Sequence, residues 1–203
     1  MSDLRAKLVV KGAYSQALQG PGAILREFGG DNGKGIIFPF TPAIMSATQI
    51  EYSKYDLAHT NYQPHAFGKS QAQTLSVTGE FFQQTQADAK YLLGVMHFLK
   101  VVTKMNFGET DEERGTPPPV LLFSAYGEHM YHKVPVLVAG VTYYLNNDID
   151  YMEIITDDDT PAKVPTSISI TIELLTQYNP TTVAKEFSLD EFAKGNLYSK
   201  GFI

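Results

Sequence analysis

Histidine and carboxylate side chains are the groups in this 203-residue sequence that could bind a metal ion or transfer protons. His129 and His132 are three residues apart, and on the strand expected there they would point to opposite faces. No third ligand stands near them in sequence, so a polar strand edge or turn is the simpler interpretation. His97 has no nucleophile motif such as G-x-S-x-G to serve. We therefore interpret His97 as an exposed or interface histidine.

Acidic residues gather in two short stretches, the first with Asp148, Asp150 and Glu153 and the second running from Asp157 to Asp159. Their oxygen atoms could hold a hard cation, but neither stretch has the twelve-residue pattern of a calcium loop. Solvated turns are the default interpretation of such stretches. A pair of carboxylates for glycoside hydrolysis stays open, because the two partners can be distant in sequence.

The glycine-rich segment Gly29–Gly35 has the composition of a phosphate-binding loop but not its spacing. In the pattern G-x-x-x-x-G-K-[ST], Phe28 would occupy the first glycine position and Gly35 the hydroxyl position. A flexible linker explains these glycines better. Because the chain shows no catalytic constellation, we expect no catalytic residue, no metal ion and no cofactor. We predict that the protein is not an enzyme.

The amino-acid composition excludes several further kinds of site and location. Cysteine is absent, which excludes a disulfide framework, a thiolate metal site and a cysteine nucleophile. No apolar run reaches about 18 residues and no secretory signal is visible, so we expect a soluble, cytoplasmically made protein with no membrane partner. The net charge is −6, and residues 105–160 hold eleven acidic side chains against Arg114 and Lys133. This balance disfavours a surface that grips nucleic-acid phosphates.

One segment predicts a long helix, Thr85–Gly108. Thr85 can cap its start, and Asp88 three residues later completes a capping-box pattern. Apolar residues fill most of the helix circumference and leave a narrow polar stripe, so we expect neighbours on more than one side. The stripe consists of Lys90, Gly94, His97, Lys100 and Lys104.

The rest of the chain has the pattern of strands. Thr74–Phe82 and Thr166–Leu175 alternate apolar with polar residues, as half-buried strands do. Val134–Leu145 is apolar at both alternating positions, which predicts a central strand. Further strands are expected at Ile36–Phe40, near Thr48–Tyr52 and at Val120–Tyr126. We predict a mainly β (α+β) fold, an antiparallel β-barrel or sandwich with one long helix packed on it.

Three regions follow from these signals: an N-terminal arm or linker (residues 1–35), a β domain (36–178) and a C-terminal arm (179–203). A short helix is expected in the last region, because Ser188 and Glu191 have capping-box spacing and Phe187 and Phe192 occupy staple positions. Gly195 stands where a helix terminator belongs. Between the strands, residues 44–70 form a long aromatic excursion, and such loops usually bind or assemble.

Several of these stretches resemble the tail-tube-like proteins of contractile-tailed bacteriophages, in particular a baseplate tube-initiator protein. The resemblance covers about Phe38 to Leu175. It depends on the order of the elements and on four motifs: FPFTP, LSVTGEFF leading into YLLGVMHFLKVVTKM, GTPPPVLLFSAYG, and VPVLVAGVTYYLNNDIDY. In that family two antiparallel sheets form a small barrel with one helix on its side, and six copies close a ring around a DNA channel.

The resemblance implies a structural virion protein of the tail or baseplate, made in the host cytoplasm, that links the hub to the tail tube. Its partners would be copies of itself in a hexameric ring and other tail-tube, hub and baseplate proteins, while DNA passes through without specific binding. Plain tube subunit, tube initiator and hub adaptor stay open. The alternative is a β-rich module of a tail that binds carbohydrate or a receptor.

Residues for these roles can be assigned as expectations. The aromatic side chains of the excursion and of the C-terminal arm are expected at intersubunit interfaces; they are Tyr55, Tyr62, Phe67, Phe187 and Phe192. In a ring, the polar faces of two alternating strands would be free to line the channel; their representatives are Thr78, Glu80, Thr171 and Glu173.

Overall fold

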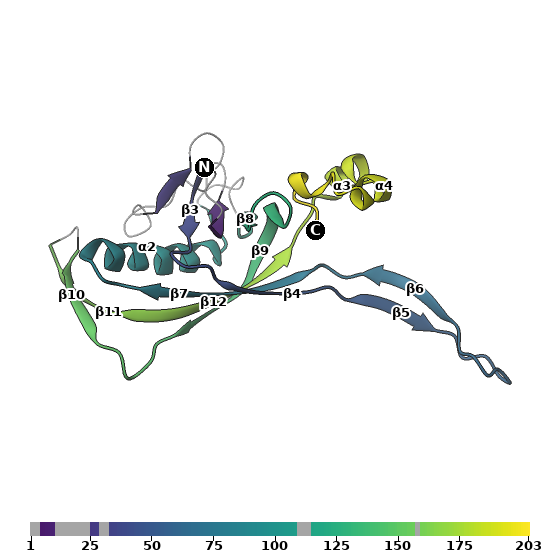
Figure 1. Cartoon of the computed structure of the whole chain (residues 1–203), viewed down its shortest axis with the longest axis horizontal. Helices are drawn as coiled ribbons and strands as arrows, with labels where there is room; N and C mark the ends of the chain where they lie inside the picture. The colour runs from purple at the N-terminus through teal and green to yellow at the C-terminus, as the bar shows by residue number, and fades with distance from the viewer. Residues whose placement is uncertain (1–4, 11–24, 29–32, 109–114, 157–158) are drawn as a thin grey trace.

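The computed structural model describes residues 5–10, 25–28, 33–108, 115–156 and 159–203. Its main element is an eight-stranded antiparallel sheet with the strand order β2-β3-β1-β8-β9-β12-β7-β4, accompanied by the two-stranded hairpins β5-β6 and β10-β11 (Figure 1). The predicted class, mainly β with one long helix on an antiparallel sheet, is confirmed. The strands of the main sheet are β1 (Lys7–Val10), β2 (Arg26–Phe28), β3 (Gly33–Ile37), β4 (Ala43–Ala47), β7 (Thr74–Phe82), β8 (Leu121–Ala125), β9 (Tyr131–Tyr144) and β12 (Ser167–Thr176).

The two alternating strands lie side by side, since β12 pairs with β7 along nine residues from Ser167↔Phe82 to Leu175↔Thr74. Apart from Phe82 and Leu175 near their ends, which are exposed, their apolar residues are buried on one face and their polar residues lie on the other. β9 lies between β8 and β12, which confirms the central strand predicted from its apolar pattern.

Helix α2 (Gln86–Val102) packs on the apolar face of the sheet (Figure 1). Thr85 caps it with the full capping box that the sequence predicts, but the helix ends at Val102, six residues before Gly108. Gly94, expected in the polar stripe, is buried with the apolar residues. A glycine has no polar side chain that must stay in water, so Gly94 did not indicate which face of the helix is exposed.

The sheet curls around this core. Phe38 follows β3 and Phe81 lies on β7. Four strands separate β3 from β7 in the sheet order, yet the two ring centroids are only 5.8 Å apart. The Phe38 ring packs against the backbone of Gly79, where an added Cβ would come within 2.4 Å of it. Residues from strands that are far apart in the sheet order therefore pack together in one hydrophobic core.

The N-terminal region differs from the expected arm. Its described residues supply β1, β2 and the start of β3, and β1 lies inside the sheet between β3 and β8. Leu8 and Val10 belong to the core. Gly35, which the sequence analysis assigned to a linker, lies on β3, where a Cβ would be 2.4 Å from the Leu8 carbonyl oxygen. Gly35 therefore permits the close pairing of β3 with β1. The remaining residues of the expected arm, 1–4, 11–24 and 29–32, lie outside the described residues.

The aromatic excursion is a hairpin that continues two strands of the sheet. β4 leads into β5 (Ile50–Lys54), and β6 (His65–Ser70) returns into β7. The Gln71 N–H donates to the Gln49 carbonyl oxygen at 2.9 Å, which links the hairpin to the paired β4 and β7. The resulting ribbon extends far from the rest of the molecule (Figure 1). We call the part formed by residues 50–70 the arm.

The second hairpin, β10 (Tyr151–Ile155) with β11 (Pro161–Pro165), lies at the end of the molecule opposite the arm (Figure 1). Residues 145–150 connect it to β9. Ile154 and Val164 of this hairpin are buried in the core.

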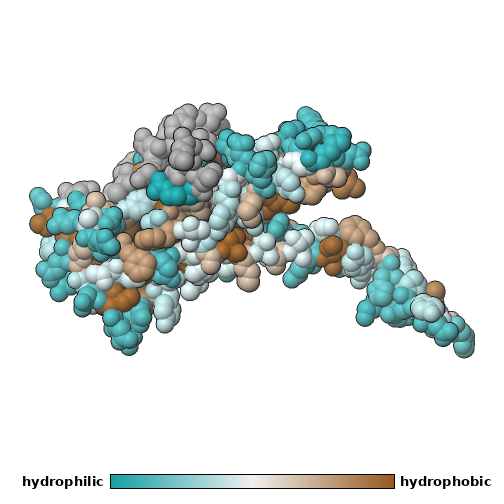
Figure 2. Space-filling view, viewed as in Figure 1, coloured by the Kyte–Doolittle hydropathy of each residue, from teal (hydrophilic) through white to brown (hydrophobic). Residues whose placement is uncertain are grey.

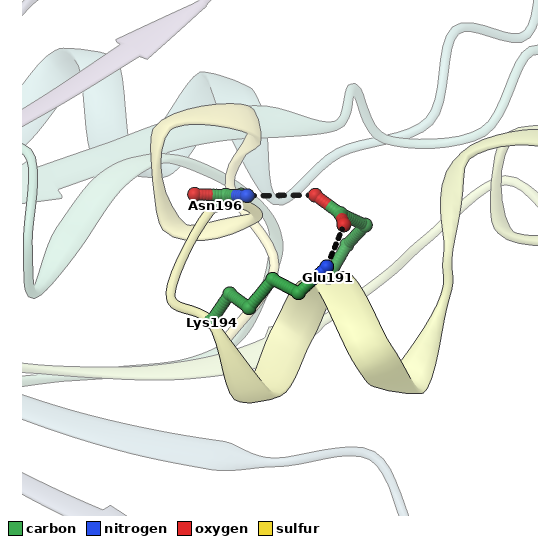
Figure 3. A network of polar contacts seen from close by, with 3 residues as sticks. All are labelled: Glu191, Lys194 and Asn196. Atoms are coloured by element: carbon green, nitrogen blue, oxygen red, sulfur yellow. Dashed lines mark hydrogen bonds and ion pairs between the residues drawn. The ribbon is translucent and has the colours of Figure 1, made fainter.

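The C-terminal region forms three short helical segments: α3 (Pro180–Glu186), α4 (Leu189–Ala193) and the 3-10 turn η3 (Tyr198–Lys200). The helix expected after Ser188 is present, and Gly195 adopts the left-handed φ of 78° that suits a terminator. Its predicted capping box is wrong, because the Ser188 side chain makes no capping hydrogen bond. Glu191 instead accepts hydrogen bonds from Lys194 (2.9 Å) and Asn196 (2.7 Å), as Figure 3 shows. These bonds hold its carboxylate on the C-terminal side of the helix.

Candidate functional site

The arm is held together by contacts between its own two strands. Tyr52 and Phe67 are opposite each other in the register and meet edge to face, with ring centroids 6.1 Å apart. Lys69 forms an exposed ion pair with Glu51 at 3.3 Å. Gln63 donates a hydrogen bond to Asp56 near the tip. These cross-strand pairs fix the register, but each contributes only a few tenths of a kcal/mol to about 1 kcal/mol.

The aromatic side chains of the arm face solvent. Tyr55, Tyr62 and Phe67, the residues expected at an interface, are 56%, 87% and 63% exposed. Every residue of β5 is exposed, so none of them contributes to the core. Figure 2 shows the arm standing clear of the body with apolar residues on its surface. An arrangement of this kind offers anchors for another molecule.

The polar face of the sheet, opposite helix α2, carries a row of hydroxyl groups. Thr78 on β7, Thr171 on β12 and Thr142 on β9 are aligned by the pairing of these strands. The Thr78 and Thr171 hydroxyl oxygens are 3.0 Å apart. Ser76 and Ser169 flank this row, and we call the surface formed by these five residues, Glu80 and Glu173 the hydroxyl face.

Two carboxylates stand on the hydroxyl face. Glu173 accepts a hydrogen bond from the Ser76 hydroxyl at 2.8 Å, and Glu80 lies opposite Ser169 in the register. Both glutamates are exposed. The structure thus brings together Thr78, Glu80, Thr171 and Glu173, the four residues assigned to a channel wall, on one surface. Such a surface is polar and weakly acidic at its centre, and the exposed side chains of Met45, Phe82 and Tyr144 lie along its borders.

The C-terminal aromatic residues form a cluster with the end of the chain. Phe187 packs on Phe192 (5.9 Å between ring centroids) and on Phe202 (5.8 Å), and Phe202 stacks on Tyr178 (5.2 Å). Phe202 and Leu197 are buried, whereas Phe187 is 43% exposed. The expected anchors Phe187 and Phe192 thus cover residues that pack beneath them.

The histidines and acidic residues form a different pattern from the one expected. His129 and His132 line the same pocket, together with Glu128, because His129 lies in the turn before β9 rather than on the strand. Glu153 pairs with Lys163 at 3.2 Å in an exposed ion pair. Within the described part of the chain, no three His, Asp or Glu side chains gather as metal ligands would. Asp157 and Asp158 lie outside the described residues.

His97 is partly buried, and its Nδ1 atom is enclosed without a hydrogen-bond partner. Edge strand β4, which was not expected from the sequence, places Met45, 70% exposed, beside the hydroxyl face. Its sequence, AIMSA, has no apolar–polar alternation, and four of its five residues are exposed, so no pattern marked it as a strand.

Within the described residues, no helix is both long enough and apolar enough to cross a membrane. Comparison with protein-family models finds no match, and comparison with curated proteins finds none either.

Proposed function

We propose that this chain is a ring-forming structural subunit of a bacteriophage tail or baseplate, which links the hub to the tail tube and lines the channel for DNA. The observation that carries the proposal is the arm. A two-stranded hairpin is marginally stable in water by itself, and this one exposes Tyr55, Tyr62 and Phe67. Packing against a neighbouring subunit would bury these aromatic side chains and hold the hairpin in place.

The sheet edge offers a second contact. β4 ends the strand order and pairs with β7 on one side. An edge strand presents backbone donors and acceptors that a strand of another subunit can pair with. A contact between β4 and a different surface of the next copy is heterologous, and heterologous contacts close into rings when the rotation permits.

The hydroxyl face supports the assignment of the channel. Hydroxyl groups with two carboxylates per copy give DNA no favourable ion pairs, so no counterions are released on contact. Six copies would repeat Glu80 and Glu173 around the wall. Their repulsion acts at short range, because salt screens it beyond about 8 Å at physiological ionic strength. DNA would therefore slide past without adhering.

The test is the oligomeric state, measured by light scattering and by electron microscopy of the purified chain. We expect hexamers or stacks at high concentration. The triple variant Tyr55→Ser, Tyr62→Ser, Phe67→Ser should remain a folded monomer by circular dichroism, since these side chains lie outside the core. Phe107→Ser with Val120→Ser is the matched control, because both residues are exposed and apolar but lie outside the arm.

Two results would refute the proposal. One is assembly of the triple variant equal to that of the wild type. The other is a wild-type chain that stays monomeric at high concentration and binds no other tail protein. A monomer that binds carbohydrate or receptor through Tyr62 would instead favour the alternative, a binding module of a tail.

A further inference from the structure

A pocket at the start of β9 is basic although the chain as a whole is acidic. It has a volume of about 430 Å³ and lies where β1 begins and β8 ends. Three basic residues (Arg5, Lys7 and Lys133) and one acidic residue (Glu128) line it, together with His129 and His132. Arg5 and Lys7 also take part in other interactions. Lys133 and His129 are exposed at the pocket.

The backbone around the pocket is held in an unusual conformation. Tyr126, which follows β8, and Lys133, which lies within β9 opposite a register shift of the β8–β9 pairing, have left-handed φ values of 59° and 51°. The Lys133 N–H donates to the Ser124 hydroxyl at 2.9 Å. Gly201 packs against the carbonyl of Lys133, where a Cβ would be 2.8 Å from the oxygen. Non-glycine residues with such φ values persist where the surroundings hold them, and they concentrate at binding sites.

An acidic turn lies at the other end of the same strand. Residues 145–150 connect β9 to β10 and carry Asp148 and Asp150, both exposed. Leu145 and Tyr151, which flank these carboxylates, are 57% and 68% exposed. The turn thus combines negative charge with two apolar anchors.

We propose that this acidic turn of one copy binds the basic pocket of a second copy. Within one chain the two surfaces are separated by the 14 residues of β9, which span about 45 Å at the usual rise of ~3.3 Å per residue. The turn therefore cannot reach the pocket of its own chain. Opposite charges at the two ends of one strand complement each other when copies meet head to tail.

The contact is heterologous, because it joins two different surfaces, so successive copies in an assembly would all point the same way. This inference extends the proposed function, since it depends on self-association of the chain, and it names a contact that the arm does not make. The held backbone of the pocket lowers the ordering cost of binding.

Charge reversal on each surface tests the proposal. Variant A carries Asp148→Lys and Asp150→Lys, and variant B carries His129→Glu and Lys133→Glu. Light scattering of the full chain should show that each variant self-associates roughly tenfold more weakly or worse, because like charges then meet. Mixing A with B should restore association, and so should all four substitutions in one chain. Lys185→Glu on α3 changes the charge by the same sign at a residue that lines neither surface, and it should leave association unchanged.

The association of the wild type and of the Lys185→Glu control should also weaken as salt is added, whereas the residual association of variants A and B should not, because salt screens attraction in the first two and repulsion in the others. Several results would overturn the proposal: unchanged association of A and B, loss without recovery on mixing, or a pocket that binds a fluorescent DNA duplex through Lys133. If the arm variant loses association while A and B keep it, the proposed function stands and the contact between the acidic turn and the basic pocket is wrong. If the wild-type chain never associates, both the proposed function and this contact are wrong.

Discussion

The Tyr91 hydroxyl binds both backbone groups of Ile37. It accepts a hydrogen bond from the Ile37 N–H at 2.8 Å and donates one to the Ile37 carbonyl at 3.0 Å. β2 pairs with β3 only as far as Gly35, so beyond that point a helix side chain takes the place of the missing strand. Helix α2 is thereby fastened to the end of β3.

Replacing Tyr91 by Phe should lower the free energy of unfolding by about 1–3 kcal/mol, because two backbone groups lose their partner. Urea unfolding followed by circular dichroism measures this change. Tyr143→Phe is the control, since its hydroxyl makes one longer bond, 3.5 Å to the Met96 carbonyl. Equal effects of the two substitutions would contradict the role assigned to Tyr91.

Gly79→Ala should destabilise the fold by roughly 1–3 kcal/mol through overpacking. The new Cβ would lie 2.4 Å from the Phe38 ring, which is itself enclosed in the core. Gly140→Ala on β9 should be tolerated, because the nearest atoms, on Glu173, are 3.8 Å away. Thermal unfolding of the two variants gives the comparison, and a smaller shift for Gly79→Ala than for Gly140→Ala would refute it.

The two helix starts should respond differently to loss of their capping residues. Thr85 accepts from the Asp88 N–H and Asp88 accepts from the Thr85 N–H, so Thr85→Ala should cost about 1 kcal/mol. Ser188 makes no such bond, and Ser188→Ala should change the free energy of unfolding by less than about 0.5 kcal/mol. Denaturant titrations measure both changes, and a larger cost at Ser188 would show that the cap geometry is different in solution.

Docking of the C-terminal segments should weaken at alkaline pH. Burial raises the pKa of Tyr178 above its usual 10.0, and the hydrogen bond from the Ile203 N–H partly offsets this rise. Since the folded pKa lies above the unfolded one, the stabilisation is complete below pH 10 and is lost as pH rises through the folded pKa. Tyr178→Phe should therefore unfold more easily than the wild type at pH 8, with the difference narrowing above pH 10; a constant difference would contradict this.

If the proposed function holds, tail particles that carry Glu80→Lys and Glu173→Lys should assemble normally and release DNA more slowly. Both side chains are exposed, so folding should be unaffected, while the reversed charge gains favourable contacts with phosphate. Glu80→Gln with Glu173→Gln is the control that removes charge without reversing it. Normal DNA release from the lysine particles would remove these residues from the channel wall.

Strands with a two-residue period could be read directly from the sequence. Thr74–Phe82 has the predicted bounds of β7, and the apolar stretch Val134–Leu145 overlaps the central β9, which begins at Tyr131 and ends at Tyr144. The capping box at Thr85 was equally clear because all of its groups lie within four residues. Local sequence patterns were enough to predict a helix or strand wherever one of its faces packs against the core.

Other features depend on contacts between distant residues. The pattern at Lys7–Val10 is too short to predict a strand, and its place in the sheet follows from pairing with residues far along the chain. Ser188 and Glu191 have capping-box spacing, but Lys194 and Asn196 compete for the carboxylate. Asn179 followed by Pro180 was an overlooked start signal for α3, where the Asn179 side chain accepts from the Thr181 N–H. The aromatic excursion was recognised, but its form as an arm required the pairing of β5 with β6.

Because the arm is exposed, the residues that could contact a partner are different from the residues that stabilise the sheet. All five residues of β5 are exposed, and the ring of Tyr52 meets Phe67 rather than the core. Substitutions between residues 50 and 70 therefore leave the packing beneath α2 unchanged. Over evolutionary time, this stretch can change its sequence to follow a changing partner while selection for a stable sheet acts elsewhere. Related chains should accordingly diverge fastest here, with the β7 and β12 patterns retained.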